Sequence, residues 1–159
     1  MTELNLITDR TQADVDYALA LKKRGWGGMT AAERAEWTAG LKGAYNTTDL
    51  NRVGEALNFL REALADEGYI SPNLFVAKTN WVATDIPTER DLSEYLSFVD
   101  SIRNATVQFA DTPLTPVYTG TLSYRSANDI EKILLAAEHI LCNIRNAWFF
   151  CDDFHCGEV

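Results

Sequence analysis

Three stretches of the chain repeat one pattern of hydrophobic and polar positions. They open at Asn46, Thr88 and Ser126, and each has an aspartate three positions later with an apolar residue directly after it. Asn, Thr and Ser cap helix N-termini because their side-chain oxygen accepts an unpaired main-chain N–H. An acid in the first turn lies at the positive end of the helix dipole. The pattern therefore predicts three helices that begin alike, at the aspartates Asp49, Asp91 and Asp129.

The bodies of these stretches carry apolar residues at alternating steps of three and four positions, which is typical of one buried helix face. The first stretch has Leu50, Val53, Leu57, Leu60 and Leu64; the second has Leu92, Tyr95, Val99 and Ile102; the third has Ile130, Ile133, Ala137, Ile140, Ile144 and Ala147. About two heptads are too short for a free coiled coil, so we expect the three faces to meet in a bundle. Val53, Val99 and Ile133 should then be buried.

Internal relatedness of the three stretches is one reading of this similarity, and the spacing lies near the periods of helical repeats, roughly 34–47 residues. The other reading is that any capped amphipathic helix looks this way. A solenoid needs uniform linkers, whereas the linkers at 68–87 and 104–125 are irregular and contain proline. They favour a compact bundle and leave room for one or two short strands.

Two shorter helices are expected before the first repeat. Thr11 or Asp9 caps a helix that runs to about Arg24, where Gly25 stops it. A second helix runs from Thr30, paired with a glutamate three positions later as in a capping box, to about residue 40.

The fold class we expect is therefore mainly α: a compact bundle of about five helices with irregular linkers. Residues 1–45 would form an N-terminal helical pair. Residues 46–159 would form the three-helix core with its proline-containing linker and a short C-terminal tail, in one compact domain overall.

The last helix carries two further apolar rows. These are Leu134, Leu141 and Trp148, and Leu135, Cys142 and Phe149. The expected polar surface consists of Glu131, Lys132, Glu138, His139, Asn143 and Arg145. A helix that is apolar on most sides is either central in its fold or buried between subunits. Both alternatives stay open at this point.

Composition narrows the classes of partner. The 159 residues are 47% hydrophobic, which suffices for a sizeable core, and the net charge of −9 disfavours binding to a phosphate backbone. The N-terminus has no secretory signal pattern, and no apolar run approaches the roughly 20 residues of a membrane span. Three cysteines do not form a disulfide framework. We expect a protein made in the cytoplasm, without membrane or nucleic-acid partners.

Catalytic signatures are absent from the sequence: it has no phosphate-binding, dinucleotide-binding, serine-nucleophile or zinc-protease motif. The tail CDDFHCGEV supplies atoms that suit zinc, in Cys151, His155 and Cys156 with Asp152 or Asp153. In a strand, however, Cys156 would point away from the others. We therefore predict no catalytic residue, metal site or cofactor, and regard His139 as a surface residue.

Aromatic residues offer an alternative function, because exposed rings can stack on sugars. The candidates are Trp26, Trp37, Tyr69, Phe75, Trp81, Trp148, Phe149 and Phe150. Aromatic residues at helical spacing or beside glycine corners are more often part of the core.

Nearly the whole chain resembles minor virion or tail-associated structural proteins of phages and prophages of gut Firmicutes. The resemblance is carried by phrases such as TDLNRVGEAL and ANDIEKILL. That group supplies no assigned site residues to transfer. The tail of this chain departs from the group by placing Cys and His where small residues are usual.

The resemblance implies a non-enzymatic phage structural or tail-associated protein that acts through helix-mediated protein–protein contacts. Its partners would be copies of itself, bound through the C-terminal helix, or other phage structural proteins. After synthesis it would be incorporated into the virion. The alternative is a module that binds host-surface glycan. An enzyme of unrecognised type has only the Cys/His tail to support it.

Overall fold

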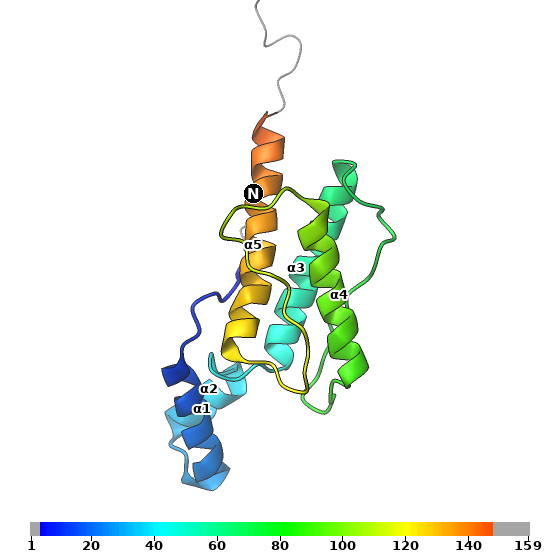
Figure 1. Cartoon of the computed structure of the whole chain (residues 1–159). Coiled ribbons are helices and arrows are strands. Elements are labelled where there is room, and N and C mark those ends of the chain that lie inside the picture. The colour runs from blue at the N-terminus through cyan, green and yellow to red at the C-terminus, as the bar shows by residue number, and fades with distance from the viewer. Residues whose placement is uncertain (1–3, 148–159) are drawn as a thin grey trace, which may run out of the picture.

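The computed structural model describes residues 4–147, which form five α-helices and one 3₁₀ turn and contain no β-strand (Figure 1). The helices are α1 (Gln12–Arg24), α2 (Ala31–Ala39), α3 (Thr47–Asp66), α4 (Glu89–Ala105) and α5 (Tyr124–Ala147), with η1 (Trp26–Gly28) between the first two. The predicted mainly α fold is confirmed. The short strands allowed for in the linkers do not form within residues 4–147.

Four of the five helix starts lie where the caps place them. Thr11, Thr30, Asn46 and Thr88 each accept a main-chain N–H of the first turn, and the acid at the third helical position bonds back to the cap. Each start is thus a complete capping box. Gly25, with φ 73°, ends α1 as expected.

The predicted start of the last helix is wrong by one turn. Ser126 lies inside α5, and the hydroxyl of Ser123 accepts its N–H at 3.1 Å. Ser123 stands three positions earlier and performs the capping role that the pattern gave to Ser126. The chain therefore turns into α5 before the repeated pattern begins.

Helices α3, α4 and α5 run in the same direction, which the colour gradient of Figure 1 makes visible. At one end, Arg10 bridges Asp49 in the first turn of α3 and Glu131 near the start of α5. At the other end, Arg145 of α5 bonds Glu67 just after α3. Parallel neighbours require long connections, and residues 67–88 and 106–123 carry the chain back each time.

The apolar faces of α3, α4 and α5 form one core. Val53, Val99 and Ile133 are 0%, 0% and 1% exposed, so the prediction that these three residues share the interior is confirmed. Phe75 and Ala77 of the first linker belong to the same core. Helices α3, α4 and α5 each pack against the other two.

One predicted surface residue of α5 is in fact buried. Glu131 is 0% exposed, and Leu134 and Leu141 of the second apolar row are buried as well. Glu131 is held inside by charged partners, which are described below. Leu135 and Cys142 of the third row are half-buried, and Trp148 and Phe149 lie outside the described residues.

The first linker returns along α3 and is fixed to that helix by side chains of the helix. Asn51 exchanges two hydrogen bonds with the main chain of Trp81, at 2.7 and 2.9 Å, and Asn58 exchanges two with Ala77, at 2.8 and 2.9 Å. Arg61 donates to the Phe75 carbonyl at 2.6 Å. Residues 75–81 thus lie antiparallel to α3.

The second linker returns along α4 in the same manner. Arg103 donates to the carbonyl of Pro113 at 2.8 Å, and the Thr115 hydroxyl donates to Asp100 at 2.8 Å. One main-chain group of this linker, the Pro113 carbonyl, is thus satisfied by a helix side chain, and Thr115 is held through its hydroxyl.

The N-terminal arm lies along α5. The main-chain N–H of Leu4 donates to Glu138 at 3.0 Å, and that of Ile7 donates to Glu131 at 2.5 Å. Because Leu4 pairs farther along α5 than Ile7, the arm also runs antiparallel to its helix.

Helices α1 and α2 form a hairpin with a small core of its own. Ala18, Leu21, Met29 and Leu41 are buried together, separately from the main core. The hairpin projects from the end of the bundle where α3 and α5 begin (Figure 1). The division of the chain at residue 45 stays a prediction. Among residues 4–147, no helix combines the length and hydropathy of a membrane span.

Candidate functional site

A crevice of about 530 Å³ lies where the α1–α2 hairpin joins the bundle. Its apolar lining comes from two stretches of the chain, 37–50 and 83–87, and consists of Trp37, Leu41, Ala44, Tyr45, Leu50 and Pro87. Polar groups of Thr38, Asn46, Thr47, Thr48 and Asp85 line the rest. The volume lies within the range typical of ligand pockets, roughly 300–1,000 Å³.

The turn after α2 shapes one wall of this crevice. Gly40 has φ 103°, which favours glycine. A Cβ atom there would lie 2.8 Å from the Thr48 hydroxyl and 3.1 Å from the Asn46 amide nitrogen. The glycine therefore lets α2 end directly against the first turn of α3. Trp37 remains 38% exposed beside that contact.

Four charged side chains fix the base of the hairpin to the bundle. The Arg10 guanidinium donates to Asp49 at 2.9 Å and to Glu131 at 2.7 Å. Arg52 donates to the same two carboxylates at 2.6 and 2.8 Å. Burial alone would lower the pKa of Arg52, but its hydrogen bonds to these carboxylates raise it above the usual value.

The Asn128 side chain closes the same junction, since its oxygen accepts from the Arg10 N–H at 3.0 Å and its nitrogen donates to the Arg10 carbonyl at 2.9 Å. Two phenols complete it. The hydroxyls of Tyr45 and Tyr95 lie 2.7 Å apart, and the Arg10 guanidinium lies 5.5 Å from the Tyr45 ring centre. Desolvation raises the pKa of both phenols above the ordinary value of 10.0. Paired charged groups and neutral hydrogen-bonding groups thus join the hairpin to the bundle.

A second crevice, of about 320 Å³, lies on the other side of the loop at residues 82–87. Lys78 lies 3.9 Å from the Trp81 ring centre and donates to Asp85 at 2.8 Å. The hydrogen bond from Lys78 holds the pKa of Asp85 below its usual value. Asp91 and Glu94 also line this crevice, which makes it acidic, while the larger crevice is mainly apolar.

The residues predicted to matter for metal chemistry are only partly within the described chain. His139 is exposed and Cys142 is half-buried. Within residues 4–147, no three His, Cys, Asp or Glu side chains come close enough to hold a metal ion. The zinc candidates Cys151, Asp152, Asp153, His155 and Cys156 lie outside the described residues.

The aromatic candidates do not gather on one surface. Trp37 lines the large crevice and half-buried Trp81 lines the small one. Trp26, 56% exposed, lies on η1 with Arg34 5.5 Å from its ring centre, and Tyr69 is exposed after α3. Phe75 is buried and stacks on Phe98. The remaining candidates Trp148, Phe149 and Phe150 lie outside the described residues.

The sequence pattern missed two parts of this region. One is the crevice itself, whose walls come from α2, the start of α3 and the 83–87 loop. The other is the charged junction between the hairpin and the bundle. The sequence does hold one signal for it, because Glu131 is an acidic residue within an otherwise apolar helix.

Exposed apolar side chains gather on the two linkers. Val76 and Ile86 in the first linker, and Val107, Leu114 and Val117 in the second, are 74–87% exposed. Hydrogen bonds fix neighbouring residues of these linkers to α3 and α4, so the apolar side chains are presented on an ordered frame.

No protein-family model, no curated protein and no solved structure matches this chain.

Proposed function

We propose that this protein is a non-enzymatic structural component of a phage virion or tail and acts by binding other protein subunits. The observation that carries the proposal is the set of five nearly fully exposed aliphatic side chains on the two linkers. The resemblance of the sequence to phage structural proteins supplies the setting.

The aliphatic side chains of the two linkers are held on ordered segments as well as exposed to solvent. Single exposed apolar residues are ordinary on any protein surface. Here, however, Val76 is adjacent to two residues that are bonded to α3, and Val117 follows a stretch that Arg103 and Asp100 bond to α4. Ordered apolar side chains lose little further entropy when a partner covers them. They suit a surface that is buried in an assembly.

The glycan-binding alternative draws on Trp37 and Trp26, the most exposed tryptophans of the described chain. A stacking platform needs aromatic faces beside hydrogen-bonding groups. Trp37 has Thr48 and Asn46 in its crevice, while Trp26 is engaged by Arg34. Binding of the full chain on a glycan array, and its loss in Trp37→Ala, would favour this alternative.

The composition of purified particles tests the main proposal. Phage particles are isolated on a density gradient from the strain that carries the gene, and their proteins are quantified by mass spectrometry. We expect the chain at a constant ratio to the major capsid protein, with abundant host enzymes absent as the control. A chain found only in the particle-free lysate would contradict the proposal.

A matched pair of variants tests the linker surface. Val107→Lys/Val117→Lys changes only exposed side chains, so we expect a normal circular dichroism spectrum and reduced incorporation into particles. The exposed polar pair Lys132→Ala/Asn143→Ala on α5 is the control and should be incorporated normally.

A further inference from the structure

The crevice at the hairpin has the chemistry to receive aromatic side chains. Its walls present Trp37, Leu41, Tyr45 and Leu50, and its volume of about 530 Å³ exceeds that of a single side chain. The twelve residues after α5 read WFFCDDFHCGEV and contain four aromatic residues. Aromatic anchors in apolar pockets are the commonest strong contacts between proteins.

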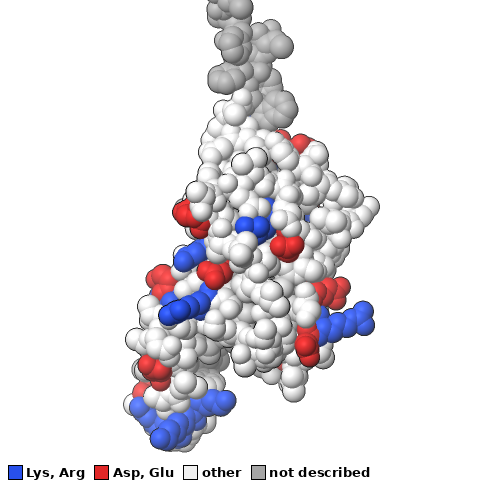
Figure 2. Space-filling model, viewed as in Figure 1, with Lys and Arg blue, Asp and Glu red and all other residues white. Residues whose placement is uncertain are grey.

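The tail and the hairpin differ in charge, and the crevice itself is lined by one charged side chain, Asp85. Residues 148–159 contain three acidic residues and no Lys or Arg. The segment 11–45 that contains the hairpin is the exception in this acidic chain, with five basic residues against four acidic ones. Lys22, Lys23 and Arg24 lie in the last turn of α1, where Figure 2 shows a cluster of basic side chains at the end of the molecule.

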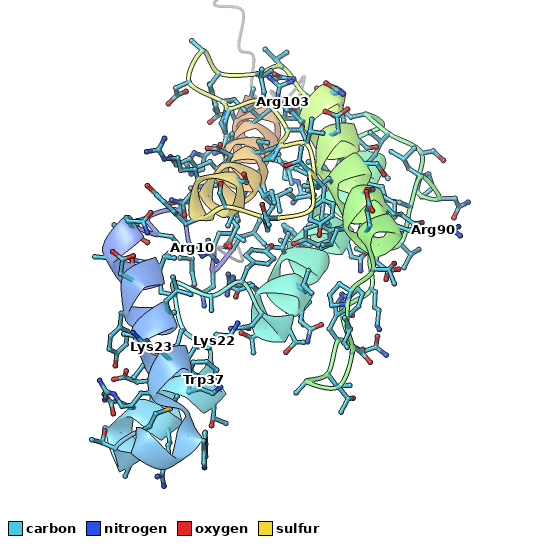
Figure 3. All side chains as sticks on the ribbon, turned by 60° about the horizontal axis from the view of Figure 1, so that its bottom comes forward. Arg10, Lys22, Lys23, Trp37, Arg90 and Arg103 are labelled. Carbon is cyan, nitrogen blue, oxygen red and sulfur yellow. The ribbon has the colours of Figure 1, made fainter. Side chains whose placement is uncertain are left out.

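The crevice and the end of α5 lie at opposite ends of the bundle. The crevice includes Asn46 and Thr47 at the start of α3, whereas Arg145 near the end of α5 bonds Glu67 just past the end of α3. In Figure 3, Trp37 lies on the hairpin beyond Arg10, at the end where α3 begins. The full length of α3, 20 residues or about 30 Å, separates the two places.

This distance favours a second copy over the same copy. Twelve residues span at most about 40 Å when fully extended. A segment that returned to its own crevice would need about nine residues to cover about 30 Å. Trp148, Phe149 and Phe150 are the first three of these residues, so they would lie between the end of α5 and the crevice and not inside it. In a neighbouring copy these aromatic residues can enter directly.

We infer that residues 148–159 of one copy bind in the hairpin crevice of a second copy, with Trp148, Phe149 or Phe150 against Trp37. This inference rests on the proposed function, since it names the subunit that an assembly component binds. The contact is head-to-tail: each copy offers a segment at one end and a crevice at the other. Such contacts generate rings or open filaments rather than closed dimers.

The first test measures self-association of the full chain by analytical ultracentrifugation in reducing buffer, so that Cys151 and Cys156 cannot form disulfides. We expect wild type to form species larger than dimers as concentration rises. The tail variant Trp148→Ser/Phe149→Ser/Phe150→Ser and the crevice variant Trp37→Ala should each raise the dissociation constant at least about tenfold. Trp26→Ala, an exposed tryptophan outside the crevice, is the matched control and should associate normally.

A second crevice variant that keeps the hairpin intact tests the same contact if the Trp37→Ala protein does not fold. Ala83→Trp places a large side chain at an exposed position on the crevice wall that lies outside the hairpin, and it should block association without removing a core residue. Circular dichroism and the thermal midpoint confirm that each variant is folded.

Mixing the variants distinguishes head-to-tail association from other arrangements. The tail variant retains a crevice and Trp37→Ala retains a tail, so an equimolar mixture should form a discrete heterodimer that cannot grow. A synthetic peptide of residues 148–159 should dissociate the wild-type assemblies.

Three results would overturn the inference. They are a wild-type chain that stays monomeric at its highest soluble concentration, association that both variants leave unchanged, and a mixture that forms no heterodimer. None of these bears on whether the chain is found in purified particles, so failure here and failure of the proposed function are separate outcomes.

Discussion

Arg61 and Arg103 occupy equivalent positions in two helices and do the same thing. Each stands twelve residues after the capping aspartate of its helix, Asp49 or Asp91, and donates to a carbonyl of the linker that follows. Asn58 and Asp100, both nine residues after the aspartate, bond the linker residue two positions beyond that carbonyl. The repeated unit is therefore a helix together with its returning segment.

Helix α5 shares the position nine residues after the aspartate, but at twelve residues it has the apolar Leu141. Glu138 stands nine residues after Asp129 and bonds the N-terminal arm at Leu4. The arm thus takes the place on α5 that the returning linkers take on α3 and α4. This correspondence supports internal relatedness of the three stretches, because nothing in a capped amphipathic helix requires a polar residue at that position to bind a neighbouring segment.

Removing the Asn58 side chain should detach the first linker from α3. Asn58→Ala deletes both hydrogen bonds to Ala77, so we expect a loss of about 1–3 kcal/mol in the free energy of unfolding. Hydrogen exchange at the Ala77 amide should become faster than in wild type. Asn80→Ala, at an exposed position of the same linker, should change stability by less than about 0.5 kcal/mol. Equal effects of the two substitutions would contradict the conclusion that Asn58 holds the first linker on α3.

At Gly54, helix propensity and packing predict opposite signs for the change in the free energy of unfolding on substitution by alanine. Alanine in a helix interior is ordinarily favoured over glycine by about 1 kcal/mol. A Cβ atom at Gly54, however, would lie 2.5 Å from the carbonyl oxygen of Lys78 in the returning linker. We expect Gly54→Ala to destabilise the protein by about 1–3 kcal/mol in urea unfolding. Gly27→Ala, where a Cβ meets nothing within 4 Å, is the control, and a stabilised Gly54→Ala protein would refute the close packing.

Glu131 and Asp49 together neutralise two guanidinium groups, those of buried Arg10 and half-buried Arg52. Glu131→Gln would leave Arg10 and Arg52 with only Asp49, so we expect unfolding to require about 3 kcal/mol less. Glu62→Gln breaks an ion pair with Arg61 in which the Glu62 side chain is 68% exposed, and it should cost less than about 1 kcal/mol. Chemical denaturation of both variants at neutral pH compares the two. Similar losses would show that the buried charges contribute no more than surface ones.

The parts of the fold that the sequence predicts are those that depend on neighbouring residues. A capping box involves residues three positions apart, as in Thr30 and Glu33, and the apolar seam of α3 lies within one helix. The start of α5 was missed because two serines, Ser123 and Ser126, compete within one turn and the pattern favoured the wrong one.

The features that could not be predicted depend on residues far apart in the chain. Glu131 is buried because Arg10 and Arg52 approach it from 121 and 79 positions away. The crevice exists because the end of α2, the start of α3 and Pro87 meet in space, and no local pattern marks such a meeting. The candidate site was therefore visible from the sequence only as separate aromatic residues such as Trp37.

The capping boxes make the stability of the helices depend on pH in a defined direction. Hydrogen bonds from the Thr88 N–H and hydroxyl lower the pKa of Asp91 below its ordinary value of 3.8. A carboxyl with a lower pKa in the folded chain binds its proton more tightly when the chain unfolds. The stabilisation from Asp91 is therefore complete above pH 3.8 and is lost as the pH falls through the folded pKa.

Asp91→Asn tests this sign. Wild type should be more stable than the variant at neutral pH, and the difference should shrink as urea unfolding is repeated down to about pH 2.5. Asp111→Asn removes an exposed linker aspartate that has no hydrogen-bond or ion-pair partner in residues 4–147, so its difference from wild type should stay small throughout. If the Asp91→Asn difference were constant or grew in acid, the carboxylate would not be the group that caps α4.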